Sequence, residues 1–165
     1  MIMRIDQAGI DFIKAAEGVK PFVYLDVAGL PTIGAGHLLT KDELASGKIV
    51  VGEYAYRYDN GLSDRLIDLL LMQDLGIAET AIQNHVKVDL DQNQYNALVS
   101  FVFNIGTGAF GKSTLLKLLN SGLHSKVPIQ MRRWIFSGGQ QIRGLKNRRE
   151  KEIALWSKKD EKRDN

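Results

Sequence analysis

Apolar side chains recur at helical spacing from residue 7 to residue 17, directly after a short polar side chain. Asp6 can accept hydrogen bonds from the first free N–H groups of a helix. Gly18 follows, and glycine commonly ends helices because it adopts the left-handed conformation without strain. The pattern therefore predicts a first helix over residues 7–17.

The pattern changes between residues 19 and 39. Phe22-Val23-Tyr24 and Thr32-Ile33 are β-formers, and turn residues separate them. The turn residues are Gly29, Pro31, Gly34 and Gly36. This alternation predicts a small hairpin sheet, and it is the only segment in which the sequence predicts β structure.

The rest of the chain has helical patterns. Thr40 and Glu43 have the spacing of a capping box, which predicts a short helix ending at Gly47. Asp91 and Gln94 have the same spacing and predict a helix that extends to about residue 103. Further helical patterns cover residues 63–75, ending at Gly76, and then residues 77–85, 115–119, 130–136 and 150–156.

These elements predict one α+β domain with two lobes. The smaller lobe, residues 1–62, contains the sheet, the larger one, residues 63–157, is helical, and a cleft is expected between them. Residues 158–165 are expected to form a charged tail. A chain of 165 residues with 44% hydrophobic and 25% charged residues has the composition of an ordinary globular domain.

Composition excludes several classes of protein. The chain has no cysteine, which excludes disulfides, thiol catalysis and a cysteine-bound zinc. The three histidines are scattered, so no metal site is expected. Residues 1–6 lack the apolar core of a signal peptide, and no apolar stretch is long enough to cross a bilayer. We therefore expect the protein to stay in the cytoplasm of the cell that makes it until it is released.

Charge is distributed unevenly along the chain. From Lys112 to the C-terminus, 14 Lys and Arg residues face 5 Asp and Glu residues, a net charge of +9. The preceding part has 8 basic and 14 acidic residues, a net charge of −6. The basic third favours an anionic partner such as a cell-wall surface, with an attraction that salt weakens. A solvated helix face with a charged tail is the alternative explanation.

Two acidic residues near the predicted sheet have the types that glycoside hydrolysis requires. Glu17 ends the first helix, eight residues precede Asp26 in the hairpin, and five more precede Thr32. The partial negative charge at a helix C-terminus favours the protonated form of a carboxyl group, as a proton donor requires. A second carboxylate can activate water or stabilise positive charge on the sugar. From residue types alone, a purely structural pair remains an alternative.

The order Glu17, eight residues, Asp26, five residues, Thr32 resembles the catalytic pattern of the phage-type lysozymes, the endolysins of tailed bacteriophages and prophages. Four other segments resemble the same family: TIGAGHLLT at residues 32–40, QYNALVSFVFNIG at 94–106, STLL at 113–116 and GLKNRRE at 144–150. The resemblance covers the chain from residue 5 to about residue 156. It implies a lysozyme-like fold with the active site in the cleft between the lobes.

The resemblance also implies a function and a set of site residues. The expected enzyme is a muramidase that hydrolyses the β-1,4 bond between N-acetylmuramic acid and N-acetylglucosamine in peptidoglycan and so lyses the host cell. Glu17 would be the general acid, and Asp26 and Thr32 would position and activate water. The residues expected to bind substrate are Gly36, His37 and Leu38 on the cleft floor, and Asn104, Gly106 and Phe110 from the helical lobe.

The expected enzyme is a monomer that uses no cofactor, nucleotide or nucleic acid and that depends on a separate holin for release. Three other functions remain open. A lytic transglycosylase would act on the same substrate with one acid. A non-catalytic module could bind the wall, and the basic region could bind nucleic acid.

Residues 106–113, GTGAFGKS, match the phosphate-binding pattern G-x-x-x-x-G-K-[ST]. A phosphate-binding loop of this kind requires a β-strand before it and a helix after it. The preceding residues predict a helix instead, so we expect a glycine-rich connection between helices, with Ser113 or Thr114 capping the second one.

Overall fold

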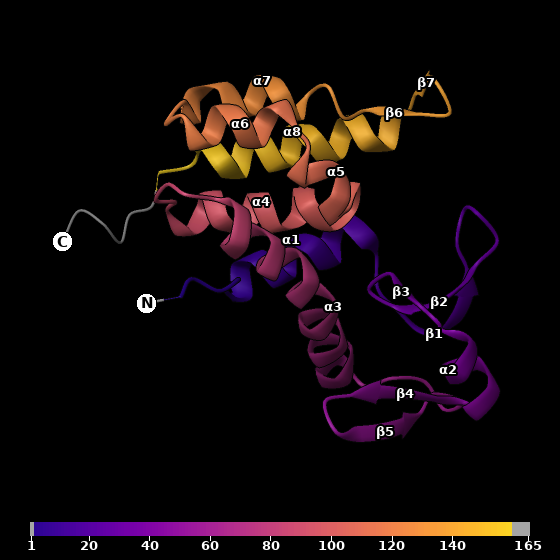
Figure 1. Ribbon diagram of the computed structural model, residues 1–165. Helices are drawn as coiled ribbons and strands as arrows, with labels where there is room; N and C mark the ends of the chain where they lie inside the picture. Colours follow the sequence, from indigo (N-terminus) through magenta and orange to yellow (C-terminus); the bar gives the residue numbers. More distant parts are fainter. Residues whose placement is uncertain (1, 160–165) are drawn as a thin grey trace. The chain divides into compact units, whose positions relative to one another are not determined.

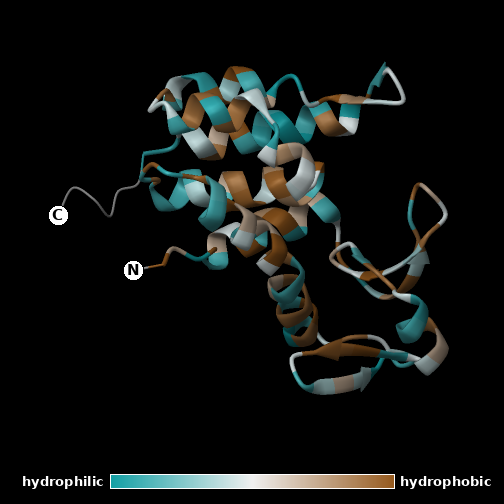
Figure 2. Cartoon of the chain, viewed as in Figure 1, coloured by the Kyte–Doolittle hydropathy of each residue, from teal (hydrophilic) through white to brown (hydrophobic). Residues whose placement is uncertain are grey.

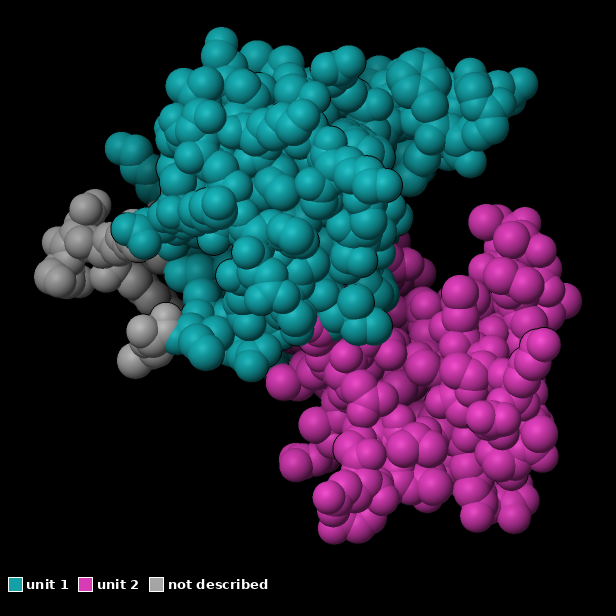
Figure 3. All heavy atoms as spheres, in the orientation of Figure 1, with its two compact units in different colours: residues 1–9, 77–165 teal, residues 10–76 magenta. Residues whose placement is uncertain are grey.

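The computed structural model describes residues 2–159 (Figure 1), and Figure 3 colours the two compact units into which the chain divides. The first unit is residues 10–76, and the second combines the chain up to Gly9 with the chain from Ile77 onward. The predicted lobe boundary at residue 62 differs from this division, because the first half of the longest helix packs with the sheets. Most of the predicted tail, from residue 160, lies outside the described residues.

Helices and five short strands make up the first unit. Its elements in chain order are α1 (Gln7–Glu17), β1 (Lys20–Leu25), β2 (Pro31–Gly34), β3 (His37–Leu38), α2 (Lys41–Ser46), β4 (Lys48–Val51), β5 (Tyr54–Arg57) and the start of α3 (Asp64–His85). Strands β1, β2 and β3 form an antiparallel sheet in that order, and β4 pairs with β5 as a hairpin.

Buried aliphatic side chains join these elements. Ile13 of α1, Ile33 of β2, Ile49 of β4 and Ile67 of α3 are each at most 1% exposed. Gly34 lies directly against α3, because a Cβ atom there would be 3.7 Å from Ile67. The first half of α3 is therefore the support on which the sheet is built.

The second unit is helical. Its elements are α4 (Gln92–Ile105), α5 (Thr107–Gly111), α6 (Thr114–Asn120), the 3-10 turn η1 (His124–Lys126), α7 (Val127–Met131), β6 (Phe136–Ser137), β7 (Gln140–Gln141) and α8 (Arg143–Ser157), together with the end of α3. Helix α4 is buried from Tyr95 to Val102, which fits its apolar colour in Figure 2, and α8 packs against it.

An ionic cluster lies inside this unit. Arg149 and Glu152 of α8 are both 0% exposed, and Arg149 Nε lies 2.7 Å from Glu152 Oε2. The Ser100 hydroxyl donates to Glu152 Oε1 at 2.7 Å, and Arg149 Nη2 donates to Asn104 Oδ1 at 2.7 Å. The Arg149 guanidinium also lies 5.1 Å from the centre of the Phe101 ring.

Most predicted helix ends are confirmed by capping hydrogen bonds. Asp6 Oδ1 accepts from Gly9 N, and Gly18 adopts φ 76° after α1. The capping box of Thr40 and Glu43 and that of Asp91 and Gln94 are both formed. The helix predicted over residues 150–156 is α8, which begins earlier, at Arg143.

Three predictions about secondary structure are wrong. Gly76 does not end a helix: α3 runs through it without a break, since the apolar periodicity on both sides keeps Leu75 and Ala78 buried. The prediction of a single β region missed the hairpins β4–β5 and β6–β7. The helix predicted over residues 130–136 ends at Met131, and Phe136 lies in a strand.

Candidate active site

Glu17 is the last residue of α1 and is partly exposed. The preceding turn is tied to α3 through Lys14, whose amine lies 2.6 Å from Asp68 Oδ1. The hydrogen bond with Asp68 raises the pKa of Lys14, which shows that the pair is stabilised in its charged form. Glu17 is therefore carried on a helix end that is fixed within its own unit.

Gly36 lies against the Glu17 carboxyl group. It occupies the turn between β2 and β3 with φ 83°, and a Cβ atom there would be 3.1 Å from Glu17 Oε2. The backbone at this turn thus limits where the carboxyl group can move. Both the positive φ and the close approach require glycine.

If Glu17 is the general acid and murein the substrate, as the resemblance implies, Gly36→Ala should lower the rate of murein hydrolysis by about 10- to 100-fold, because displacing a reacting group by about 1 Å has effects of that size. Gly47→Ala is the matched control, since Gly47 has φ 68° and a Cβ atom added there would meet no atom within 4 Å. Both changes strain the backbone, by about 1 kcal/mol. Equal rates for the two variants in a turbidity assay would show that contact with Glu17 does not matter.

Asp26 is fixed by its own loop. Its Oδ1 atom accepts hydrogen bonds from the N–H groups of Ala28 and Leu30, both at 2.8 Å, while its own N–H donates to the Leu30 carbonyl at 3.0 Å. Asp26 Oδ2 has no hydrogen-bond partner among the residues that the structure describes. One carboxylate oxygen therefore anchors the side chain, and the other is available.

Thr32 lies on β2, opposite Tyr24 of β1 and Leu38 of β3. It is 2% exposed, and its hydroxyl donates to the Leu30 carbonyl at 2.9 Å. Because the hydroxyl proton is used in this bond, Thr32 can act toward a water molecule only as an acceptor. Thr32 and Asp26 both bond to Leu30, which couples their positions.

Tyr24 connects the two acids, and sequence reasoning gave it no role of its own. Burial raises the pKa of its phenol, and the negative charges of Glu17 and of Asp26 raise it further. Both carboxyl groups therefore lie within electrostatic reach of one side chain. No signal in the sequence marks this position, because Tyr24 is the one residue of β1 that is partly buried, and the burial of β1 does not alternate.

His37 forms a partly buried ion-pair group next to this turn. Its Nδ1 lies 2.8 Å from Asp74 Oδ2 of α3, and its Nε2 lies 3.1 Å from Glu43 Oε2 of α2. Burial alone would lower the pKa of His37, but the two carboxylates outweigh burial and raise it to about 8. The prediction that His37 binds substrate remains a prediction, and its contacts show that it joins β3 to two helices.

This pKa predicts a loss of stability at alkaline pH. Since the folded value of about 8 exceeds the ordinary histidine value of 6.5, the contribution is complete below pH 6.5 and disappears as the pH rises through 8. The difference corresponds to about 2 kcal/mol. Urea unfolding at pH 6 and pH 9 measures it, and His37→Gln should remove most of the difference. A wild-type unfolding free energy that does not change between these pH values would contradict the prediction.

The remaining predicted binding residues have different environments. Leu38 is 51% exposed on β3, in the same unit as Glu17. Asn104, Gly106 and Phe110 belong to the other unit, and the Asn104 side chain is bonded to Arg149. Phe110 is 0% exposed, and its ring packs in the core. That these four residues bind substrate remains a prediction.

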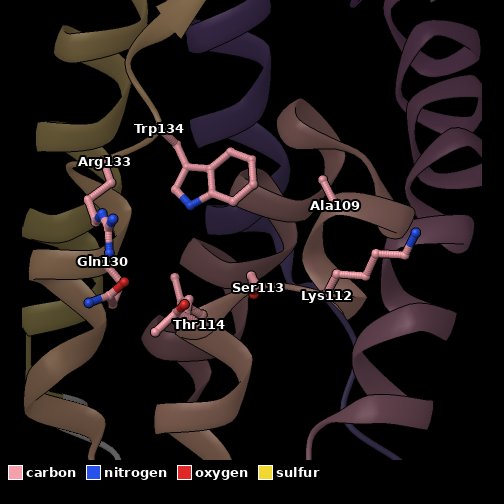
Figure 4. Close-up of a pocket in the computed structure, with 8 residues that line it drawn as sticks. Ala109, Lys112, Ser113, Thr114, Gln130, Arg133 and Trp134 are labelled. Carbon is pink, nitrogen blue, oxygen red and sulfur yellow. The ribbon is translucent and has the colours of Figure 1, made fainter.

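The glycine-rich residues 106–113 do not form a phosphate-binding loop. Helix α4 precedes them, α5 lies inside them, and Ser113 caps α6 by accepting from Leu116 N. Figure 4 shows the hollow of about 510 Å³ that Lys112 and Ser113 border, together with Gln130, Arg133 and Trp134. The Lys112 amine points away from Trp134 in that view. The predicted connection between helices is confirmed.

The α+β fold and the acids of the first unit are compatible with the class of lysozyme-like glycoside hydrolases, and the comparisons with known proteins show that class. Residues 14–152 match the family model described as phage lysozyme. The SAR-endolysin of Escherichia phage Mu is 38% identical over 141 residues, which cover 86% of this chain and 74% of that protein. The endolysin of Salmonella phage P22 is 40% identical over 121 residues, or 72% and 75% of the two chains.

The endolysin of Bacillus phage PZA is 34% identical over 94% of this chain, which spans 55% of that longer protein. Among solved structures, a P22 lysozyme mutant superposes with a TM-score of 0.79 at 34% identity, covering 94% of this chain and 99% of that one. The muramidase domain of SpmX from Asticaccaulis excentricus has a TM-score of 0.74 at 32% identity, with the same coverage.

This chain belongs to the phage lysozyme family. It is a glycoside hydrolase of the muramidase type that acts on bacterial peptidoglycan, and the predicted lysozyme-like fold is confirmed. Within the part of the chain that the structure describes, no helix combines the length and the apolar character needed to cross a membrane.

Proposed function

We propose that the chain hydrolyses the β-1,4 bond between N-acetylmuramic acid and N-acetylglucosamine, and that Glu17 donates a proton to the leaving oxygen. Asp26 and Thr32 position and activate the attacking water. Three observations support the assignment: the Gly36 turn lies against the Glu17 carboxyl group, two loop N–H groups hold Asp26, and the charges of both acids act on Tyr24. Glycosidases use such a pair of carboxyl groups on the two sides of the scissile bond.

The contacts of Asp26 suit the role of a base. A carboxylate that accepts two N–H groups keeps its orientation, and Oδ2 is the atom that would take a proton from water. Thr32 would accept a second hydrogen bond from the same water. In this mechanism water attacks the anomeric carbon directly, Glu17 protonates the departing oxygen, and the configuration inverts. Attack by Asp26 itself would retain the configuration.

Analysis of the products tests the proposal. Hydrolysis adds one water to each cleaved bond and leaves reducing ends, whereas a lytic transglycosylase leaves 1,6-anhydro ends without adding water. Mass spectrometry of digested murein distinguishes the two, and release of no fragments at all would indicate a wall-binding module. Proton NMR of the first product then shows whether the anomeric configuration inverts, and initial release of the retained anomer would exclude direct attack by water.

The proposed biological role is lysis of the host cell. The protein would accumulate in the cytoplasm, act as a monomer and reach the wall through a separate pore-forming protein. The exposed cations of the second unit support a contact with anionic wall components. Lys112 and Arg133, at the hollow shown in Figure 4, form no ion pair with any residue between 2 and 159.

A further inference from the structure

Two tyrosines project from the hairpin β4–β5. This hairpin contains none of the residues assigned to the candidate active site. Tyr54 is 69% exposed and Tyr56 is 37% exposed. They are two residues apart on β5 and therefore share one face of the strand. Their ring centres are 6.5 Å apart with an angle of 53° between the ring planes.

The hairpin holds this tyrosine pair in a fixed position. Gln73 of α3 donates to the Val50 carbonyl at 2.9 Å and accepts from Gly52 N at 2.9 Å, so one amide group holds the end of β4 and the start of the turn. Ile49, the cross-strand partner of Tyr56, is 0% exposed and anchors the hairpin in the core. Rings on a rigid support lose little conformational entropy when a ligand binds.

The chemistry of the pair suits an uncharged, hydroxylated ligand. Neither tyrosine hydroxyl has a hydrogen-bond partner among the described residues, so both can donate to and accept from a ligand. Charges on the hairpin are balanced: Lys48 is offset by Glu53, and Arg57 is paired with Asp59 at 2.8 Å. A polyanion would therefore find no net attraction here.

We propose that the tyrosine pair is an accessory binding surface for the glycan strand of peptidoglycan, in which the apolar faces of two sugar rings pack on Tyr54 and Tyr56. The surface would keep the enzyme on its polymer between cleavage events. The inference depends on the glycan substrate of the family and not on the roles proposed for Glu17 and Asp26.

Binding of the full chain to purified murein tests this inference. The parent is Glu17→Gln, used to prevent cleavage, and dissociation constants are measured by co-sedimentation. Adding Tyr54→Ser and Tyr56→Ser is expected to raise the dissociation constant by about tenfold, the size of effect found for aromatic side chains at binding surfaces. Tyr54→Phe keeps the ring and should stay within about threefold of the parent.

Val50→Ser is the matched control. Val50 is 50% exposed on the same hairpin, but it pairs with Ala55 and so points to the face opposite the tyrosines. It should bind murein like the parent. Tyr54→Ser alone provides a variant with little effect on folding, since its ring is mostly exposed, and circular dichroism checks the fold of each variant.

Three results would overturn the inference: unchanged binding in the double serine variant, an equal loss in Val50→Ser, or a tyrosine effect that disappears at high salt. Failure of the proposed catalytic role is seen separately, as cleavage of murein by Glu17→Gln. The two failures are therefore distinguishable, because one is measured as binding and the other as turnover.

Discussion

Glu17→Gln is expected to slow murein hydrolysis by about 100- to 10,000-fold, the usual contribution of a general acid. Glutamine has the same shape and keeps the space beside Gly36, but its amide cannot give a proton to the leaving oxygen. The alkoxide must then leave unprotonated, which raises the barrier by about 3 to 5 kcal/mol. Clearing of a murein suspension and a zymogram measure the loss.

The control for this variant is Glu150→Gln, which makes the same chemical change at an exposed ion pair with Arg132. Exposed pairs of this kind contribute about 1 kcal/mol or less, so clearing should be unaffected. Circular dichroism must show the native fold for Glu17→Gln as well. If a folded Glu17→Gln cleared murein at more than about a tenth of the wild-type rate, a general acid at this position would be ruled out.

Arg149→Met is expected to have the largest effect on stability, lowering the free energy of unfolding by about 3 to 5 kcal/mol. Methionine fills much of the same volume but leaves the Glu152 carboxylate buried, with less compensation for its charge. Burial raises the pKa of Glu152, and Arg149 and Arg148 oppose that shift. Glu152 of the variant should therefore bind a proton more readily, so the deficit should be smaller at pH 5 than at pH 8.

Urea unfolding at both pH values measures this difference, and Arg132→Met is the comparison. Arg132 forms an exposed pair with Glu150 at 2.8 Å, and its replacement should cost about 1 kcal/mol or less. Equal losses for the two arginines would mean that burial of the Arg149 pair adds nothing to stability. Restored stability in the double variant Arg149→Met, Glu152→Leu would support the unpaired charge as the cause.

Helix starts that depend on local capping residues could be predicted from the sequence. The caps at Asp6, Thr40 and Asp91 act within three residues, and the spacing of Glu17, Asp26 and Thr32 lies within one helix, one turn and one sheet. These features depend on short-range geometry that a sequence displays directly. The family resemblance then supplied the chemistry that residue types alone left open.

The features that sequence reasoning missed depend on contacts between distant segments. The hairpin β4–β5 is fixed by Gln73, which is more than twenty residues from Val50, and a three-residue run of β-branched side chains is too short to predict it. The sequence predicts a helix end at Gly76, but packing on both sides overrides the low helix propensity of glycine. The burial of Arg149 beside Glu152 and Asn104 also needs three-dimensional information, because arginine is seldom found inside proteins.

The division of the chain at Gly9 and Gly76 has a consequence for folding during translation. Residues 10–76 are contiguous, so we expect this unit to complete its own contacts as soon as it leaves the ribosome. The first residues are synthesised earlier but belong to the other unit: Ile5 N bonds to Glu79 at 2.8 Å, and Asp6 Oδ1 accepts from Asn96 at 2.7 Å. Residues 5 and 6, made before this unit, thus wait for partners made much later.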